Sequence, residues 1–298
     1  MSTQAPAAAR PRRQGGILAG RSTRLTRGYS GALRLGVALA VILVVLDVGL
    51  PLVMHLNPGA VNLFDRFRSL NTPGHPLGTD DLGRDVLARV VYGFRWSVGV
   101  AATATTVLIL IGGLAGVIAA AVGGIVQQVV VRAIDLSISL PYLVIAVVIL
   151  AVLGHGFVPL CLTLGVVSWP IFARVIYTES RSLLQRDYVL AARLAGVRPY
   201  KSVLTHVIPG LKTVTMVMTA FLFADMIVAE SALSFLGLGA TLGSPSLGTM
   251  LSDGRTYMVT APTLTVIPGA AIVLAVITAN LIGDGIAHGA SSDEGQFE

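Results

Sequence analysis

Charged side chains are scarce in this sequence: of its 298 residues only 12% are charged, whereas 54% are hydrophobic. Soluble domains carry about 25% charged residues. A soluble chain of this length would have to hide more apolar surface than a single core can enclose. The low charge therefore excludes an ordinary soluble domain and predicts a protein whose solvent is the lipid bilayer.

Side chains for catalysis and metal binding are also missing. Cys161 is the only cysteine and lies in an apolar run, which excludes a disulfide framework and a cysteine-based metal site. The five histidines do not have the spacing of metal ligands. Lys201-Ser202 follows Tyr200 rather than the glycine of a phosphate-binding loop, and no Gly-x-Ser-x-Gly motif occurs. We predict no catalytic residue, no metal and no cofactor, and thus a protein that is not an enzyme.

Long hydrophobic runs are what the sequence does contain. A bilayer is crossed by about 20 apolar residues in a helix, and six segments satisfy this requirement. We predict an all-α membrane protein with six transmembrane helices, at residues 33–54, 97–122, 136–153, 157–178, 213–232 and 264–283.

The basic residues indicate the orientation of the chain. Of the 21 Lys and Arg residues, seven lie in residues 10–34 and seven in residues 174–212. Loops rich in Lys and Arg stay in the cytoplasm, so we expect both termini and the loop at 179–212 to be cytoplasmic in the cell membrane. Residues 1–31 are predicted to be a disordered basic tail and residues 287–298 a C-terminal tail.

The first extracytoplasmic loop, residues 55–96, ends in a helical pattern. From Leu82 onward the larger apolar side chains fall on one half of a helical wheel and most polar ones on the other. We predict a separate amphipathic helix, capped by Thr79 or Asp80, that lies at the outer interface. Residues 32–96 would then hold the first transmembrane helix and this loop, and residues 97–286 a core of five transmembrane helices.

The loop at 179–212 contains signals for a short isolated helix. Asp187 is a suitable N-cap and Gly196 a suitable residue just beyond the C-cap, and Pro199 prevents continuation. A helix of about two and a half turns is not stable in water on its own. It must be held by its own bundle or by another protein.

The surface of this short helix suggests a contact with another protein. Tyr188, Ala191, Ala192 and Ala195 form one narrow stripe on the helical wheel, flanked by Arg193 and other basic side chains. Small side chains allow a second backbone to approach closely, and the tyrosine can fill a pocket. The alternative is a surface helix whose alanines serve helix propensity alone.

Several motifs resemble those of bacterial ATP-binding-cassette importer permeases. Leu190-Ala191-Ala192-x-x-x-Gly196, followed by His206-Val207-Ile208-Pro209, is similar to their EAA loop, with Leu190 at the position of the glutamate. Further blocks resemble the C-type subunit of the dipeptide/oligopeptide permease family: His75-Pro76-Leu77-Gly78-Thr79-Asp80-Asp81-Leu82-Gly83-Arg84-Asp85-Val86-Leu87, Glu230-Ser231-Ala232-Leu233-Ser234-Phe235-Leu236-Gly237-Leu238-Gly239, Pro245-Ser246-Leu247-Gly248-Thr249-Met250-Leu251-Ser252-Asp253-Gly254 and Asn280-Leu281-Ile282-Gly283-Asp284-Gly285.

The resemblance implies a function and a set of partners. Such permeases pair with a second, B-type permease, dock on two cytoplasmic ATPase subunits that hydrolyse ATP, and receive substrate from an extracytoplasmic binding protein. The helix from Asp187 to Gly196 would be the coupling helix that enters a cleft on an ATPase, with Pro209 in its extension. The expected substrates are dipeptides and oligopeptides, with haem, nickel or glutathione as alternatives. No nucleic acid is expected as a partner.

Three acidic residues lie in apolar runs, where an ionisable side chain usually has a function. Asp47 is expected near the outer end of the first helix. Asp225 lies well inside the fifth segment and is a candidate for the translocation path, as is Glu230, for which a structural role beside a helix break at Gly237 is the alternative. Two rival hypotheses remain: a proton-coupled peptide transporter that uses Asp225 and Glu230, and a membrane scaffold without transport.

Overall fold

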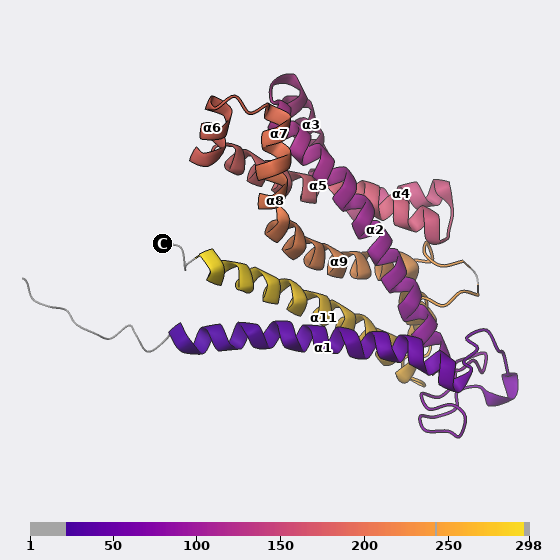
Figure 1. Cartoon of the computed structure of the whole chain (residues 1–298). Helices are drawn as coiled ribbons and strands as arrows, with labels where there is room; N and C mark the ends of the chain where they lie inside the picture. The colour runs from indigo at the N-terminus through magenta and orange to yellow at the C-terminus, as the bar shows by residue number, and fades with distance from the viewer. Residues whose placement is uncertain (1–21, 242, 295–298) are drawn as a thin grey trace, which may run out of the picture.

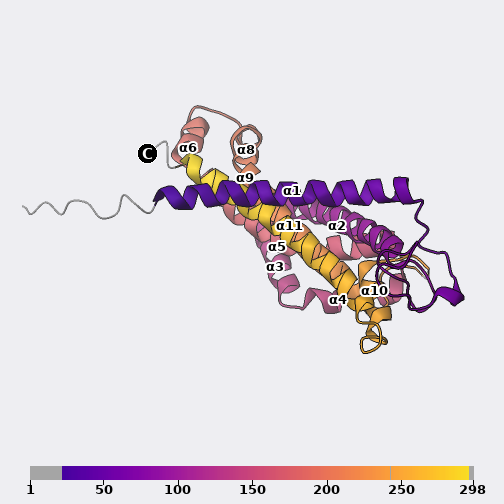
Figure 2. The ribbon, with the colours of Figure 1, turned by 90° about the horizontal axis from the view of Figure 1, so that it is seen from below.

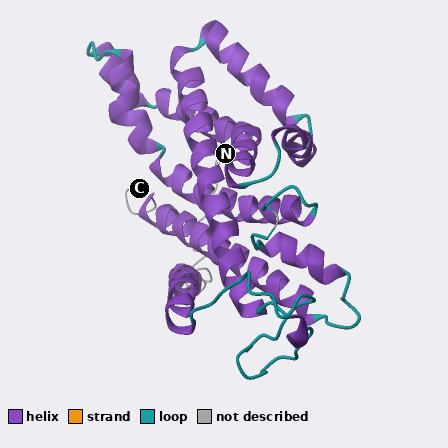
Figure 3. Ribbon diagram, turned by 90° about the vertical axis from the view of Figure 1, so that its right-hand side faces the viewer, coloured by secondary structure: helices purple, strands orange, loops and turns teal. Residues whose placement is uncertain are grey.

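The computed structural model describes residues 22–241 and 243–294, and in this part of the chain helices are joined by turns and loops, without a strand (Figures 1 and 3). The all-α prediction is therefore confirmed. In chain order the elements are α1 (Ser22–Met54), η1 (Leu63–Asp65), α2 (Val86–Val122), α3 (Gly124–Ile138), α4 (Tyr142–Leu153), α5 (Phe157–Leu184), α6 (Asp187–Leu194), α7 (Pro199–Ser202), the π-helical η2 (Val203–Val207), α8 (Ile208–Gly210), α9 (Lys212–Phe235), α10 (Leu247–Arg255) and α11 (Thr263–Glu294).

Five of the described helices, α1, α2, α5, α9 and α11, are long and apolar enough to cross a membrane. The third predicted span, residues 136–153, falls on α3 and α4, which are bent by 88° at the break between them. A single straight helix over residues 136–153 is therefore wrong. Pro141 lies at the break, where it has no N–H to donate and disfavours a helical conformation at Leu140. The chain is a multi-pass membrane protein.

The helix predicted at the outer interface is instead the beginning of α2, which continues without a break to Val122. Its cap is Asp85, whose Oδ1 accepts hydrogen bonds from the N–H groups of Leu87 at 2.7 Å and Ala88 at 3.2 Å. Thr79 and Asp80, the predicted caps, belong to the preceding turn. No proline occurs between Asp85 and Val122, so nothing in the sequence forces a break between the two predicted helices. The predicted end of this span is confirmed, because α2 ends at Val122. Gly123, which follows, has a φ of +69°, in the left-handed region that favours glycine.

The centre of the bundle is the contact between α2 and α5, the most extensive helix pair in the described structure. Two glycines one turn apart on α2 make it possible. A Cβ atom on Gly112 would lie 2.7 Å from the carbonyl oxygen of Trp169, and one on Gly116 would lie 2.7 Å from that of Ala173. Small residues four apart allow membrane helices to approach this closely. The helices α1, α10 and α11 are packed mainly against α9 and one another.

The two terminal helices, α1 and α11, lie side by side in both orthogonal views (Figures 1 and 2). α1 begins at Ser22 and α11 ends at Glu294, so residues 22–31 and 287–294 are helical rather than parts of tails. The remainder of the predicted tails, residues 1–21 and 295–298, lies outside the described residues. At the other end, Arg95 of α2 bonds to Asp47 of α1, with Nε 3.2 Å from the carboxylate, so this acid links two helices.

Candidate functional site

α6, the short helix predicted from the motif, follows α5 after two residues. Its first hydrogen bonds run from the N–H groups of Val189 and Leu190 to the carbonyl oxygen of Arg186, at 2.9 Å and 3.1 Å. Arg186 is therefore the N-cap, and Asp187, predicted in that role, is the first helical residue. The carboxylate of Asp187 still lies at the positive end of the helix dipole, where a negative charge is favourable.

The C-terminal end of α6 is as predicted. Gly196 has a φ of +87°, in the left-handed region that favours glycine. The N–H of Val197 returns to the carbonyl oxygen of Ala192 at 3.1 Å, the six-residue closure typical of a glycine-terminated helix. Pro199 does more than prevent continuation, because it begins the next short helix, α7.

One side chain fixes α6 to the bundle. Val189 is 0% exposed and belongs to the same core as residues at the end of α5 and just before α9: Leu183, Leu184, Val207 and Leu211. Burial of a valine contributes roughly 1.5–3 kcal/mol. Sequence reasoning missed this anchor, because in so short a helix one apolar residue gives no period. It answers the question of what holds the helix: its own bundle does.

The predicted stripe faces outward for the most part. Ala191 and Ala195 are exposed, and Ala192 is partly buried. Tyr188 is 48% exposed, and its ring lies 5.8 Å from the ring of His206 in η2. The tyrosine is thus held on one side by the loop and open on the other. The side chain of Arg193 lies outside the described part of the structure.

An exposed apolar surface adjoins the stripe and was not predicted. Leu194 is 90% exposed and Leu190 42% exposed. In η2 and α8, Leu204 and Ile208 are exposed as well, and Pro209 lies next to them on the surface. Exposed apolar side chains gathered on the short helices at one end mark a candidate protein–protein interface. The helical repeat does predict that Leu190 and Leu194, four apart, share a face, and this signal could have been used.

α6 and α7 lie at the same end of the molecule as the beginning of α1 and the end of α11 (Figures 1 and 2). The long loop between α1 and α2 lies at the opposite end. The chain thus presents its short exposed helix and its described terminal segments on one side.

The two acids predicted for the translocation path have different surroundings. Glu230 is 0% exposed, and its carboxylate accepts a hydrogen bond at 2.6 Å from Ser234, one turn later in α9. Ser231 donates a longer bond to the other oxygen at 3.4 Å. Asp225 is partly buried on the same helix, beside the hydroxyl group of Tyr142 in α4. Five residues apart on α9, the two acids point about 140° away from each other around the helix axis.

A network of charges at the opposite end of the molecule was not predicted. Asp80 accepts hydrogen bonds from the backbone N–H of Leu82 and Arg84, both at 2.9 Å, and from both the Arg84 and Arg89 guanidinium groups. Burial acts to raise the pKa of Asp80, but the backbone N–H of Arg84 and the charges of Arg89 and Arg84 outweigh it, so the pKa lies below its usual 3.8. Arg89 also bonds to Asp253 of α10 at 3.1 Å.

This network links two of the sequence blocks. The turn at residues 75–85 and α10 belong to blocks far apart in the sequence, and Arg89 bonds to an aspartate in each of them. Tyr257, just after α10, adds a ring contact to Phe67 in the α1–α2 loop, with centroids 5.0 Å apart. The α1–α2 loop is therefore fastened to α10 rather than free.

Across the described residues, no group of three or more metal-binding side chains comes together. The site therefore consists of an exposed helix at one end, a charge-bonded loop at the other, and apolar membrane helices between. These features describe a multi-pass membrane protein with a short helix exposed at one end.

Comparison with known proteins gives the family. Residues 109–289 match the model of the binding-protein-dependent transport system inner membrane component, and the chain belongs to this family. It is 34% identical over 212 residues to the dipeptide transport system permease protein DppC of Alkalihalophilus pseudofirmus, covering 71% of this chain and 70% of that protein.

Two further relatives are similar over a comparable length. The oligopeptide transport system permease protein OppC of Escherichia coli is 33% identical, covering 72% of this chain and 70% of the relative. The glutathione transport system permease protein GsiD of Pectobacterium atrosepticum is 32% identical, covering 75% of this chain and 74% of the relative. The predicted resemblance to the dipeptide/oligopeptide permeases is confirmed.

Proposed function

We propose that the chain is a permease subunit of an ATP-driven importer of short peptides, and that α6 is the helix through which ATPase subunits move it. The single observation that carries the coupling role is the exposure of α6: one buried side chain, Val189, fixes it, and most of the rest of its surface is open. The relatives named for dipeptides and oligopeptides support the substrate class.

The partners follow from what this chain contains and what it lacks. It has no phosphate-binding loop in its sequence, so ATP is hydrolysed by other subunits. We assign two ATPase subunits to the α6 end, an extracytoplasmic binding protein to the opposite end, and a second, B-type permease as the other half of the membrane path. The surrounding bilayer covers the remaining apolar surface.

The distribution of basic residues supports a cytoplasmic α6. The segment at 174–212 carries seven Lys and Arg residues. It lies at the same end as the beginning of α1 and the end of α11. Under the positive-inside rule both chain termini are cytoplasmic. The charge-bonded turn and α10 then lie on the outer side, where a binding protein delivers its cargo.

Transmission of movement depends on how firmly α6 is joined to the membrane helices. Val189 contacts the core that includes the end of α5 and the start of α9, so a displacement of α6 moves both helices. A helix pair packed in this way shifts as a rigid body rather than bending. Closure of the ATPases would thereby change which side of the membrane the path faces.

For the path itself we retain Asp225 as the candidate contact for a peptide ammonium group. Glu230 is bonded within its own helix and fully buried, which favours its structural role in holding the end of α9. A proton-coupled transporter that uses both acids gains no support from this arrangement, because the two acids point about 140° away from each other around α9.

Uptake by a reconstituted complex tests this proposal. The chain is co-produced with a B-type permease and the ATPases of its own system, placed in vesicles, and supplied with labelled dipeptide, oligopeptide, glutathione, haem or nickel and the binding protein. We expect peptide uptake that requires ATP and the binding protein and survives an uncoupler. Uptake without ATPase subunits, abolished by the uncoupler, would contradict the proposal, and so would transport of haem or nickel alone.

A further inference from the structure

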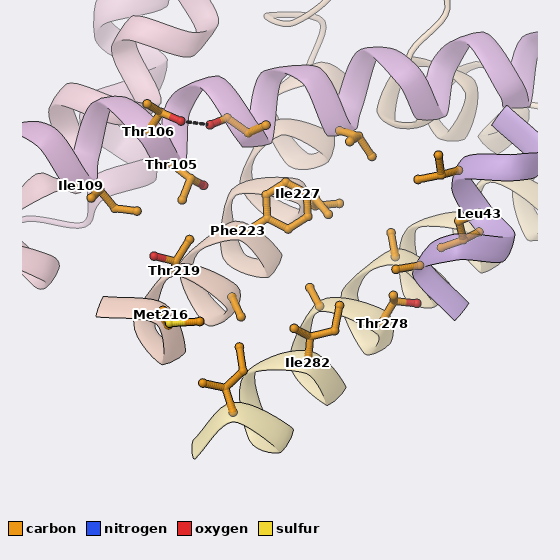
Figure 4. A pocket seen from close by; sticks show the side chains of 18 of the residues that line it. Leu43, Thr105, Thr106, Ile109, Met216, Thr219, Phe223, Ile227, Thr278 and Ile282 are labelled. Carbon is orange, nitrogen blue, oxygen red and sulfur yellow. Dashed lines mark hydrogen bonds between the residues drawn. The ribbon is translucent and has the colours of Figure 1, made fainter. Parts of the chain in front are cut away.

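A cavity of about 660 Å³ lies between α1, α2, α9 and α11 (Figure 4). Its walls include Phe94 and Ile109 of α2, Phe223 of α9 and Ile282 of α11. Neither Asp225 nor Glu230 is among its lining residues, so it is separate from the candidate path residues.

The cavity is long. Its lining residues extend from Phe94 to Ile109 on α2, from Thr215 to Ile227 on α9 and from Ala275 to Ile286 on α11. At 1.5 Å per residue these stretches are about 16–22 Å long. A flexible hydrocarbon chain can extend along them.

The walls are those of a hydrocarbon site. None of the described residues that line the cavity is charged. Of its five threonines, three bond their hydroxyl groups to carbonyl oxygens of their own helices: Thr106 to Ala102, Thr219 to Thr215 and Thr278 to Leu274. A peptide here would leave most of its amide groups without partners, at a cost of several kcal/mol each. The chemistry favours an aliphatic chain.

A positive charge lies beyond one end of the cavity. Lys212, which is exposed, is one turn before Thr215 and Met216 on the same face of α9. The nearest acid on α11, Asp284, is 200° around the helix from Ile282 and thus faces away from the cavity. Basic side chains at the cytoplasmic end of membrane helices attract anionic lipid headgroups.

We propose that this cavity binds one acyl chain of an anionic phospholipid from the cytoplasmic leaflet, with the phosphate group at Lys212. The lipid fills the space between the α1–α11 pair and the α2–α9 pair. It thereby acts as a structural ligand of the permease. This inference rests on the proposed orientation in the membrane and not on the transported substrate.

Retention of lipid by the purified protein tests the proposal. The protein is extracted in mild detergent, stripped of loosely bound lipid, and offered phosphatidylglycerol or phosphatidylcholine with the same acyl chains. Native mass spectrometry counts the lipid that remains. We expect about one retained phosphatidylglycerol per chain, and a preference over phosphatidylcholine that falls about fivefold in Lys212→Gln, since one basic residue near the surface contributes that much.

Filling the cavity supplies the matched comparison. Ala279→Phe places a ring in the cavity, whereas Val228→Phe adds the same ring to an exposed position on α9 that does not line it. We expect Ala279→Phe to lose the retained lipid at least tenfold and Val228→Phe to keep it. Equal retention by both variants would overturn the proposal. So would loss of the second permease from Ala279→Phe with unchanged lipid, because the cavity would then be a helix interface.

The two proposals fail in distinguishable ways. A wild-type complex that retains phosphatidylglycerol but transports no peptide would refute the proposed function and leave the lipid site intact. A complex that imports peptide and retains neither lipid would refute the lipid site alone. Lys212→Gln is a surface change, so its preference ratio remains measurable even where Ala279→Phe fails to fold.

Discussion

Arg89 in α2 and Asp253 in α10 are joined by a hydrogen bond of 3.1 Å although they are 164 positions apart in the sequence. Arg89 also bonds to the buried Asp80 in the preceding turn. The guanidinium group thus connects the α1–α2 loop, α2 and α10. This connection fixes the shape of the end of the molecule opposite α6.

Removal of the two acids should have unequal effects on stability. Asp80→Asn leaves the buried Arg89 without its nearest carboxylate, and loss of one partner of a buried pair costs about 3–5 kcal/mol. The side chain of Asp253 is 50% exposed, so Asp253→Asn should cost less than about 1 kcal/mol. Thermal unfolding in detergent measures both. Similar losses for the two variants would contradict the assigned network.

The ion pair between Asp80 and Arg89 predicts that stability depends on pH. Because the pKa of Asp80 is lowered in the folded protein from its usual 3.8, its stabilising contribution is present above that value and is lost as the pH falls through the lower, folded-state value. The difference in unfolding temperature between wild type and Asp80→Asn should therefore be constant near neutral pH and shrink below pH 3.8. A difference that persisted at such acidity would assign the effect to another group.

Glycine replacements should locate the tight contact of the bundle. Gly116→Ala brings a Cβ to 2.7 Å from the backbone oxygen of Ala173, whereas Gly113→Ala meets only the ring of Phe172 at 3.5 Å, an ordinary contact. We expect Gly116→Ala to lose about 1–3 kcal/mol from overpacking and Gly113→Ala to remain near wild type. Unfolding in detergent and yield of folded protein distinguish the two. Equal stability would place the α2–α5 contact elsewhere.

Much of the fold could be predicted from hydrophobic run length alone, because a span needs about 20 apolar residues wherever it lies. The bend at Pro141 and the fusion of the outer helix with α2 could not, since both depend on whether two adjacent apolar runs share one axis. A proline indicates that a helix can break, and the absence of proline indicates that it can continue. The length of an apolar run carries no information on either.

The candidate site likewise has features that could be predicted from the sequence and features that could not. Gly196 could be predicted because a left-handed residue after a helix favours glycine, a local rule. The anchoring role of Val189 depends on Val207 and Leu211, which only the folded chain brings beside it. A helical wheel places Arg89 on the polar side of its helix. Its partner Asp253 lies in a distant block, and no sequence signal links the two residues.

Two substitutions on α6 should separate anchoring from docking. Val189→Ala removes buried methyl groups and loosens the helix from the bundle, so we expect ATPase subunits still to bind while less peptide is imported per ATP hydrolysed. Leu194→Ala removes an exposed side chain, 90% accessible, so we expect weaker ATPase binding with unchanged stability of the permease. Co-purification and the ratio of uptake to ATP hydrolysis measure the two effects. Identical behaviour of both variants would contradict the division of roles.

The central claim is that the exposed face of α6 links this permease to ATP hydrolysis. Ala191→Arg tests it directly, because Ala191 is exposed and an arginine there need not disturb the fold, while Gln185→Arg adds the same charge at an exposed turn outside the stripe. In reconstituted complexes with the binding protein and peptide present, we predict that Ala191→Arg loses stimulated ATP hydrolysis and uptake together, by at least tenfold, and that Gln185→Arg keeps both. Wild-type rates of both reactions in Ala191→Arg would contradict the account.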